Sequence, residues 1–121
     1  MEFDEVSSKI IKCALEVHKE LGPGLMESVY HRALQWEFDA DHIRYSTEVE
    51  LPIIYKGHPL PGNYRLDLFV EGCVVVEIKA VERILPVHLA QTLTYMKLIN
   101  SKIGLLLNFN DSRLLIKRLV L

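Results

Sequence analysis

Apolar side chains recur along this chain with two different periods. Over residues 4–20 they return every three to four positions, which is the spacing of a helix that packs one face against a core. After a break at residues 21–24 the same spacing predicts a second helix over about 26–40. A third helix is expected over about 86–100, where Pro86 suits the first helical turn.

Five further segments are rich in β-branched, aliphatic and aromatic residues and predict strands. Their expected ranges are 45–55 with a bend at Pro52, 64–70, 74–80, 102–109 and 114–121, and residues 56–62 are expected to form a loop. The resulting order, ααβββαββ, indicates an α/β (α+β) fold in which helices cover a mixed sheet. The length of 121 residues suits a single domain over residues 1–121.

The two middle strands predict a hairpin that brings two carboxylates together. If its loop has three residues and is centred on Gly72, Asp67 lies opposite Glu77 and both side chains share one face of the sheet. A two-residue loop would instead place Asp67 opposite Val76. The second strand is apolar on both faces at its start, which is typical of a central, covered strand.

Asp67, Glu77 and Lys79 form a candidate catalytic group. Two adjacent carboxylates repel each other unless a cation lies between them, and their hard oxygen atoms suit Mg²⁺, Mn²⁺ or Ca²⁺. A nearby lysine can stabilise a negatively charged transition state, so the set is suited to phosphodiester hydrolysis. The alternative is an ordinary strand end with Glu–Lys and Asp–Lys salt bridges, and this pattern alone leaves both interpretations open.

Composition narrows the class of protein. The chain is 50% hydrophobic and 25% charged, and no apolar run approaches the roughly 20 residues of a membrane span. Its first five residues are acidic and polar, unlike a signal peptide. Cys13 and Cys73 lie far apart and predict reduced thiols in a cytoplasmic protein.

Charge is unevenly distributed along the chain. The net charge is −2, but residues 1–50 carry 11 acidic and 5 basic side chains, whereas residues 51–121 carry 5 acidic and 9 basic ones. Arg65 and Lys79 belong to the second, positive part. This distribution permits a phosphate-bearing substrate without requiring one.

Two helices supply further candidates. Gln91 and Tyr95 are four residues apart and share a face of the third helix, where Gln91 could contact Lys79 or a phosphate oxygen. The alternative is a polar helix surface with a half-buried tyrosine. Glu27 and Tyr30 open the second helix, although Glu27 also satisfies the helix dipole. Histidine and cysteine spacings do not support a zinc site, and the aromatic residues show no spacing of a stacking platform.

Several motifs occur together in a fixed order. They are Gly24-x-x-Glu27-x-x-Tyr30, Tyr64-Arg65-x-Asp67, Glu77-x-Lys79-Ala80-Val81-Glu82, Pro86-Val87-His88-x-Ala90-Gln91, Thr94-Tyr95, Gly104-Leu105-Leu106-x-Asn108-Phe109 and Ile116-Lys117-Arg118. This set closely resembles the GxxExxY protein family, which is assigned to the PD-(D/E)XK nuclease superfamily. The resemblance runs from about residue 5 to the last residue.

The resemblance implies a restriction-endonuclease-like fold and a metal site. Mg²⁺ or Mn²⁺ would be held by Asp67 and Glu77, with the Ile78 carbonyl and Glu27 as further ligands. Lys79 would be the catalytic lysine.

The resemblance also implies a substrate. Gln91 and Tyr95 are similar to the Gln-x-x-x-Tyr motif of the exonuclease branch, and Arg65 and Tyr30 are further candidates for substrate contact. The expected function is a metal-dependent nuclease acting on DNA, with RNA as the second candidate substrate and a homodimer as a candidate assembly. Two alternatives are a catalytically silent module that binds nucleic acid or protein, and hydrolysis of a small phosphorylated molecule.

Overall fold

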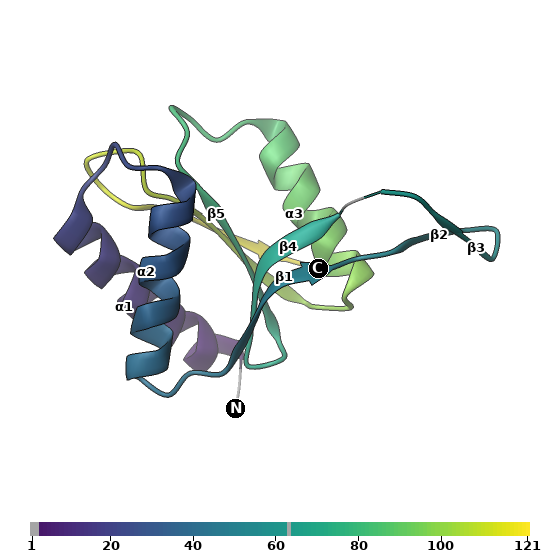
Figure 1. Cartoon of the computed structure of the whole chain (residues 1–121), viewed down its shortest axis with the longest axis horizontal. Helices are drawn as coiled ribbons and strands as arrows, with labels where there is room; N and C mark the ends of the chain where they lie inside the picture. The colour runs from purple at the N-terminus through teal and green to yellow at the C-terminus, as the bar shows by residue number, and fades with distance from the viewer. Residues whose placement is uncertain (1–2, 63) are drawn as a thin grey trace.

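The computed structural model describes residues 3–62 and 64–121 (Figure 1). The helices are α1 (Phe3–Leu21), α2 (Glu27–Ala40) and α3 (Pro86–Leu98). The strands are β1 (Tyr45–Glu50), β2 (Ile53–Tyr55), β3 (His58–Leu60), β4 (Arg65–Val70), β5 (Val74–Lys79), β6 (Ile103–Asn108) and β7 (Leu115–Val120). The helices begin and end within two residues of the ranges that the apolar spacing predicts.

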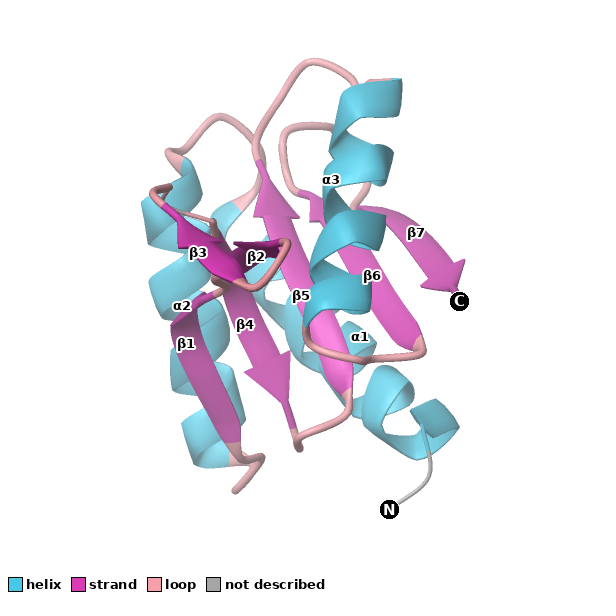
Figure 2. Cartoon of the chain, turned by 90° about the vertical axis from the view of Figure 1, so that its right-hand side faces the viewer, coloured by secondary structure: helices cyan, strands magenta, loops and turns pink. Residues whose placement is uncertain are grey.

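Five strands form one mixed sheet with the order β1-β4-β5-β6-β7. Neighbouring strands are antiparallel except β5 and β6, which are parallel and are connected through α3. The helices α1 and α2 cover one face of this sheet and α3 covers the other (Figure 2). The predicted mixed sheet flanked by helices is therefore confirmed. The central position of β5 is also confirmed, because its first five residues are all buried.

Two apolar cores lie on the two faces of the sheet. The larger one, under α1 and α2, contains the fully buried rings of Tyr30, Phe38 and Phe109. The smaller one, under α3, is built from Leu66, Val75, Tyr95 and Met96, with Leu51 at its edge. Tyr95 is 4% exposed, so α3 packs one of the predicted site residues against the sheet.

The β4–β5 hairpin has the register on which the candidate site depends. Leu68 pairs with Val76 and Val70 pairs with Val74, so the loop is centred on Gly72 and has three residues. Gly72 takes a positive φ of 63°, a conformation that glycine adopts without steric cost. Continuing this register places residue 67 opposite residue 77, as predicted.

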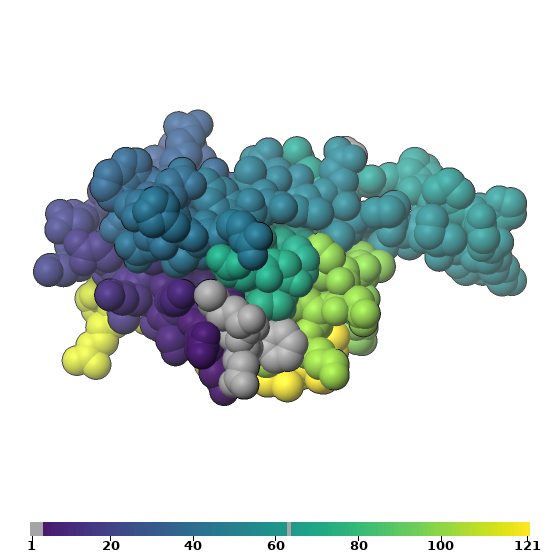
Figure 3. Space-filling model, turned by 90° about the horizontal axis from the view of Figure 1, so that it is seen from below, coloured from purple at the N-terminus to yellow at the C-terminus, as the bar shows by residue number. Residues whose placement is uncertain are grey.

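The segment after β1 differs from the prediction. The expected strand over 45–55 ends at Glu50, and the expected loop over 56–62 contains part of a second hairpin, formed by β2 and β3. Lys56 and Gly57, with φ values of 49° and 79°, form its two-residue turn. This hairpin, residues 53–60, is called the arm below. It extends away from the rest of the molecule (Figures 1 and 3).

Candidate active site

Asp67 lies where the sheet is locally unpaired. On one side, β1 and β4 pair both before and after this point, but Glu48 and Asp67 are left out of the ladder. Glu48 has a φ of 50°, which is unusual for a residue other than glycine inside a strand. On the other side, the pairing of β4 with β5 stops at Leu68 and Val76. The backbone groups of Asp67 therefore need partners from outside the ladder.

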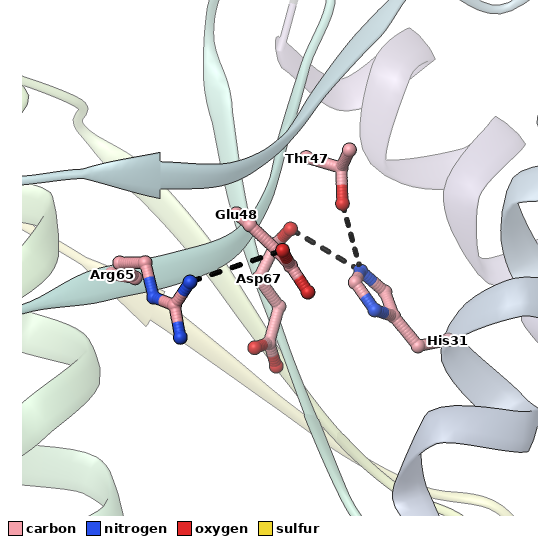
Figure 4. A network of polar contacts seen from close by, with 5 residues as sticks. All are labelled: His31, Thr47, Glu48, Arg65 and Asp67. Carbon is pink, nitrogen blue, oxygen red and sulfur yellow. Dashed lines mark hydrogen bonds and ion pairs between the residues drawn. The ribbon is translucent and has the colours of Figure 1, made fainter.

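Side chains supply these partners. The Asp67 N–H donates to Oε2 of Glu77 at 2.7 Å, and the Ile78 N–H donates to Oδ2 of Asp67 at 2.8 Å. The Asp67 carbonyl lies 3.3 Å from Nε2 of His31, which also lies 3.2 Å from Oγ1 of Thr47. In Figure 4 the imidazole sits beside the Asp67 carbonyl, while the Asp67 carboxylate points away from it. The Glu77 carboxylate thus binds the backbone of Asp67, the Asp67 carboxylate binds the backbone of the residue after Glu77, and both are held in place.

The two carboxylates are costly in their ionised form. Glu77 is only 3% exposed, and burial, followed by the charge of Asp67, raises its pKa to about 8. Burial also raises the pKa of Asp67, and the Lys79 ammonium opposes this rise at both groups. A pair of this kind gains stability from a further cation, because opposite charge favours the ionised form.

The charge of Lys79 acts on both carboxylates although Lys79 forms no direct ion pair with either of them. Ion pairs such as Arg44–Glu71, Arg65–Glu48 and Arg118–Asp4 form elsewhere, and among the described residues none involves Lys79. Its side chain is half-buried at the end of β5. The Glu–Lys and Asp–Lys salt bridges of the alternative interpretation are therefore not formed. The ammonium keeps the hydrogen-bonding capacity that a phosphate oxygen could use.

The donor set fits a hard cation held by two carboxylates. Within residues 3–62 and 64–121, no group of three or more His, Cys, Asp or Glu side chains converges as a metal-binding cluster. Asp67 and Glu77 each use one oxygen in a hydrogen bond, which leaves the second oxygen of each for a ligand. Mg²⁺ is commonly bound through one or two carboxylates, with water and substrate phosphates completing its shell.

Backbone geometry places the Ile78 carbonyl beside this pair. The Phe109 N–H donates to the Lys79 carbonyl at 2.9 Å, so Lys79 turns its backbone groups toward β6. Because these groups alternate sides along a strand, those of Ile78 face β4. The hydrogen bond from the Ile78 N–H to Asp67 agrees with this direction.

Glu27 reaches the same end of the sheet from the start of α2. Its Oε1 accepts a hydrogen bond from the Ala80 N–H at 3.3 Å, and its charge raises the pKa of both Asp67 and Glu77. It also lines a cleft of about 330 Å³ with Met26, Ser28, His31, Asp67 and Ile78. His31 is the site residue that the sequence interpretation missed. The available signal was its spacing of four from Glu27, which puts both on one helix face.

Gln91 and Tyr95 approach from the other face of the sheet. Nε2 of Gln91 donates to the Tyr95 hydroxyl at 2.8 Å, so the predicted pair on one helix face is formed. Burial raises the pKa of Tyr95, and the nearby charges of Glu77 and Asp67 act in the same direction. The observed partner of Gln91 is therefore Tyr95.

The structure does not bring Tyr30 to the cleft. Its ring is fully buried and stacks on Phe109 at 4.6 Å between centroids. Its hydroxyl donates to the Gly22 carbonyl at 2.6 Å and accepts from the Leu25 N–H at 3.1 Å. A substrate contact by Tyr30 is therefore inconsistent with its placement. Arg65 remains exposed at the start of β4, with a weak contact of 4.0 Å to Glu48 (Figure 4).

Comparison with known proteins is consistent with this fold. The model of the PD-(D/E)XK nuclease superfamily matches residues 4–119, so the chain belongs to that superfamily. The crystal structure of SSO0001 is similar in fold, with a TM-score of 0.60 and 23% identity over 78% of this chain. The chain spans 50% of the length of that protein. Comparison with curated proteins finds no match.

A membrane span is not found among the described helices. None of α1, α2 and α3 is both long and apolar enough to cross a bilayer. This agrees with the absence of a long apolar run from the sequence.

Proposed function

We propose that the protein is a metal-dependent nuclease that hydrolyses phosphodiester bonds in DNA, with RNA as the second candidate substrate. One observation carries the proposal. Asp67, half-buried, and Glu77, buried, lie side by side at a break in the sheet and have raised pKa values, and Lys79 lies nearby with no ion pair to any described residue. This arrangement is costly for stability alone and is of use when a cation and a phosphate enter.

The residues have separate roles in the proposed reaction. Asp67 and Glu77 would hold Mg²⁺ or Mn²⁺ through their free oxygen atoms, together with the Ile78 carbonyl. When bound, such an ion neutralises phosphate charge and lowers the pKa of water. Lys79 would stabilise the negative charge that develops on the phosphate or orient the attacking water. Gln91, held by Tyr95, would present its remaining polar atoms to the substrate.

The GxxExxY resemblance belongs to the same proposal, and the contacts around α2 support it. Tyr30 ties together Gly22 and Leu25, the chain segment that leads into α2. Glu27 then begins α2 and reaches the end of β5. The tyrosine of the motif would thus position the glutamate, which would act beside the metal. A cytoplasmic location and a homodimer remain predictions.

A silent binding module is the second candidate. The net charge of −2 favours it, because nucleases usually neutralise several phosphates with basic side chains. Such a module would bind nucleic acid or protein and keep the carboxylate pair without turnover.

Cleavage assays separate the two candidates. Labelled single- and double-stranded DNA and RNA are incubated with Mg²⁺ or Mn²⁺, with EDTA in parallel. We expect Lys79→Ala to lose about 10²–10³-fold in cleavage rate, as when a transition-state donor is removed. Asp67→Ala should lose at least as much.

The matched control is Lys117→Ala, which removes an exposed lysine from the edge strand β7 and should cleave at the wild-type rate. Wild-type rates in either site variant would contradict the mechanism. A lack of metal-dependent cleavage of all four substrates would contradict the nuclease and favour the binding module.

A further inference from the structure

Much of the apolar surface of the arm is open to solvent. Ile54 is 59% exposed, Tyr55 57% and Leu60 45%, so apolar groups are open to solvent on both of its faces. A two-stranded hairpin of this size is marginally stable in water unless something packs against it. Figure 3 shows the arm extending beyond the body of the molecule.

The chemistry of the arm favours an anionic partner. Residues 51–65 contain no Asp or Glu but include Lys56, His58 and Arg65. The Lys56 ammonium lies 5.5 Å from the centroid of the Tyr55 ring, and His58 pairs with Tyr55 across the hairpin. An exposed aromatic ring beside a cation suits a nucleotide, because the ring can stack on the base and the cation can bind the phosphate.

The arm also joins the sheet at the candidate site. The Leu51 N–H donates to the Tyr64 carbonyl at 2.7 Å and closes the base of the arm, three residues before Asp67. Tyr64 is 46% exposed, and it contributes to the raised pKa of Tyr95 on α3. The arm and α3 lie on the same side of the sheet (Figures 1 and 2). A nucleic-acid strand bound at the candidate site could therefore continue onto the arm.

We propose that the arm binds an unpaired stretch of nucleic acid next to the candidate active site formed by Asp67, Glu77 and Lys79, with Tyr55 stacking on a base and Lys56 contacting the backbone. The proposal rests on the proposed function and names the form of its substrate. An unpaired stretch is required because the bases of a duplex are stacked on each other and offer no free face to Tyr55. The spacing of aromatic residues in the sequence does not reveal this site, because only the fold places Tyr55 on the projecting arm and Tyr64 at its base.

Binding is measured by fluorescence anisotropy with a labelled oligodeoxythymidine in EDTA, so that cleavage does not interfere. We expect Tyr55→Ala to weaken binding about tenfold and Tyr55→Phe to bind like the wild type, because the ring is kept. Lys56→Ala should weaken binding less, and its effect should shrink in high salt. The matched control is Trp36→Ala, which removes a 69% exposed aromatic side chain from α2.

Wild-type affinity in Tyr55→Ala would overturn the proposal, as would a loss that appears only with duplex DNA. Dimers that dissociate in Tyr55→Ala with unchanged oligonucleotide affinity would also overturn it and assign the arm to contacts between copies. The two proposals fail differently. If binding depends on Tyr55 but no metal-dependent cleavage occurs, the proposed nuclease activity is wrong and the binding role of the arm stands. If cleavage occurs but binding does not depend on Tyr55, the binding role of the arm is wrong and the nuclease activity stands.

Discussion

Glu77 is a single residue whose position in the candidate site lowers the stability of the folded protein when its carboxylate is ionised. Its carboxylate is almost fully buried, lies beside a second carboxylate, and accepts only the Asp67 N–H among the hydrogen bonds of the described residues. In the metal-free protein this environment favours the protonated form. Its folded-state pKa of about 8 lies above the ordinary value of 4.5. The folded state therefore binds this proton more tightly than the unfolded state does.

The sign of the pH dependence follows from this difference. The contribution of Glu77 to stability is most favourable below about pH 4.5 and is lost as the pH rises through about 8. We expect Glu77→Gln, in EDTA, to be more stable than the wild type by a few kcal/mol at pH 8, because the amide carries no charge and its oxygen can still accept the Asp67 N–H. The gain should shrink toward pH 4.5.

Urea unfolding across this pH range measures the difference directly. Glu50→Gln, which removes an exposed carboxylate at the end of β1, is the control and should change stability little at any pH. If the unfolding free energies of the wild type and Glu77→Gln change in parallel with pH, the pKa of Glu77 is not raised in the folded state.

The sequence revealed one part of this residue-scale picture and not another. Counting outward from Gly72 predicts that Asp67 faces Glu77, because a hairpin register is fixed by its loop length. The break in the ladder around Asp67 could not be predicted in this way. It depends on a positive φ at Glu48, a residue type that gives no signal for that conformation. The part played by His31 depends on this break, because its imidazole lies against the released Asp67 carbonyl.

At the scale of elements, α3 lies close to the sheet where β6 has a glycine. A Cβ added at Gly104 would lie 2.6 Å from Sδ of Met96, which is fully buried and has little room to move. This contact gives a physical reason for the glycine in the Gly-Leu-Leu-x-Asn-Phe motif. It also sets the distance between α3, which carries Gln91 and Tyr95, and the carboxylates on the sheet.

We expect Gly104→Ala to destabilise the protein by about 1–3 kcal/mol through overpacking. Combining it with Met96→Val, which shortens the opposing side chain, should cost less than the sum of the two single changes. Urea unfolding of the four proteins gives the coupling. Gly62→Ala is the control, because its added Cβ meets only ordinary contacts, the nearest at 3.5 Å. Strict additivity would rule out the Gly104–Met96 contact as the cause.

The elements themselves were predictable to different degrees. Helices of 13 to 19 residues repeat their apolar pattern often enough to be located within two residues. The arm was interpreted as the end of a bent strand and a loop because Pro52, Gly57 and Pro59 occur within eight residues. Its strands have only three residues each, too few to show alternation, and Pro59 is tolerated because β3 has an exposed edge.

At the scale of the whole molecule, the uneven charge along the sequence gives the two sides of the sheet different net charges. The acidic part, residues 1–50, supplies α1, α2 and β1, whereas the basic part supplies the arm, α3 and the other strands of the sheet. One side of the sheet is therefore covered by acidic helices that would repel a polyanion. The side that holds α3 and the arm is the more favourable one for the proposed nucleic acid (Figure 2), although α2 lines the cleft at Asp67.

Arg83 is a basic residue close in sequence to the candidate site. It is exposed in the loop between β5 and α3, four residues after Lys79. Asn108 fixes this loop, since its Nδ2 donates to the Val81 carbonyl at 2.9 Å and its Oδ1 accepts the Val81 N–H at 3.1 Å. Arg65 lies at the start of β4, on the other side of Asp67 from the hairpin loop. Arg65 and Arg83 are thus exposed basic residues two positions from Asp67 and four from Lys79 in the sequence.

Removing these charges should change the salt dependence of nucleic-acid binding. Each phosphate contact that is lost lowers the slope of log affinity against log salt by about 0.7 for a single strand and about 0.9 for a duplex. We expect Arg83→Ala and Arg65→Ala each to reduce the slope by about this amount, and the double variant by about twice as much. Lys12→Ala, on the outer surface of α1, should leave it unchanged, because this lysine lies in the acidic layer. Anisotropy titrations at several salt concentrations in EDTA give the slopes. An equal reduction of the slope in Lys12→Ala would mean that binding follows net charge alone. A reduction confined to the two arginine variants would place the nucleic acid at the end of the sheet that carries Asp67 and Glu77.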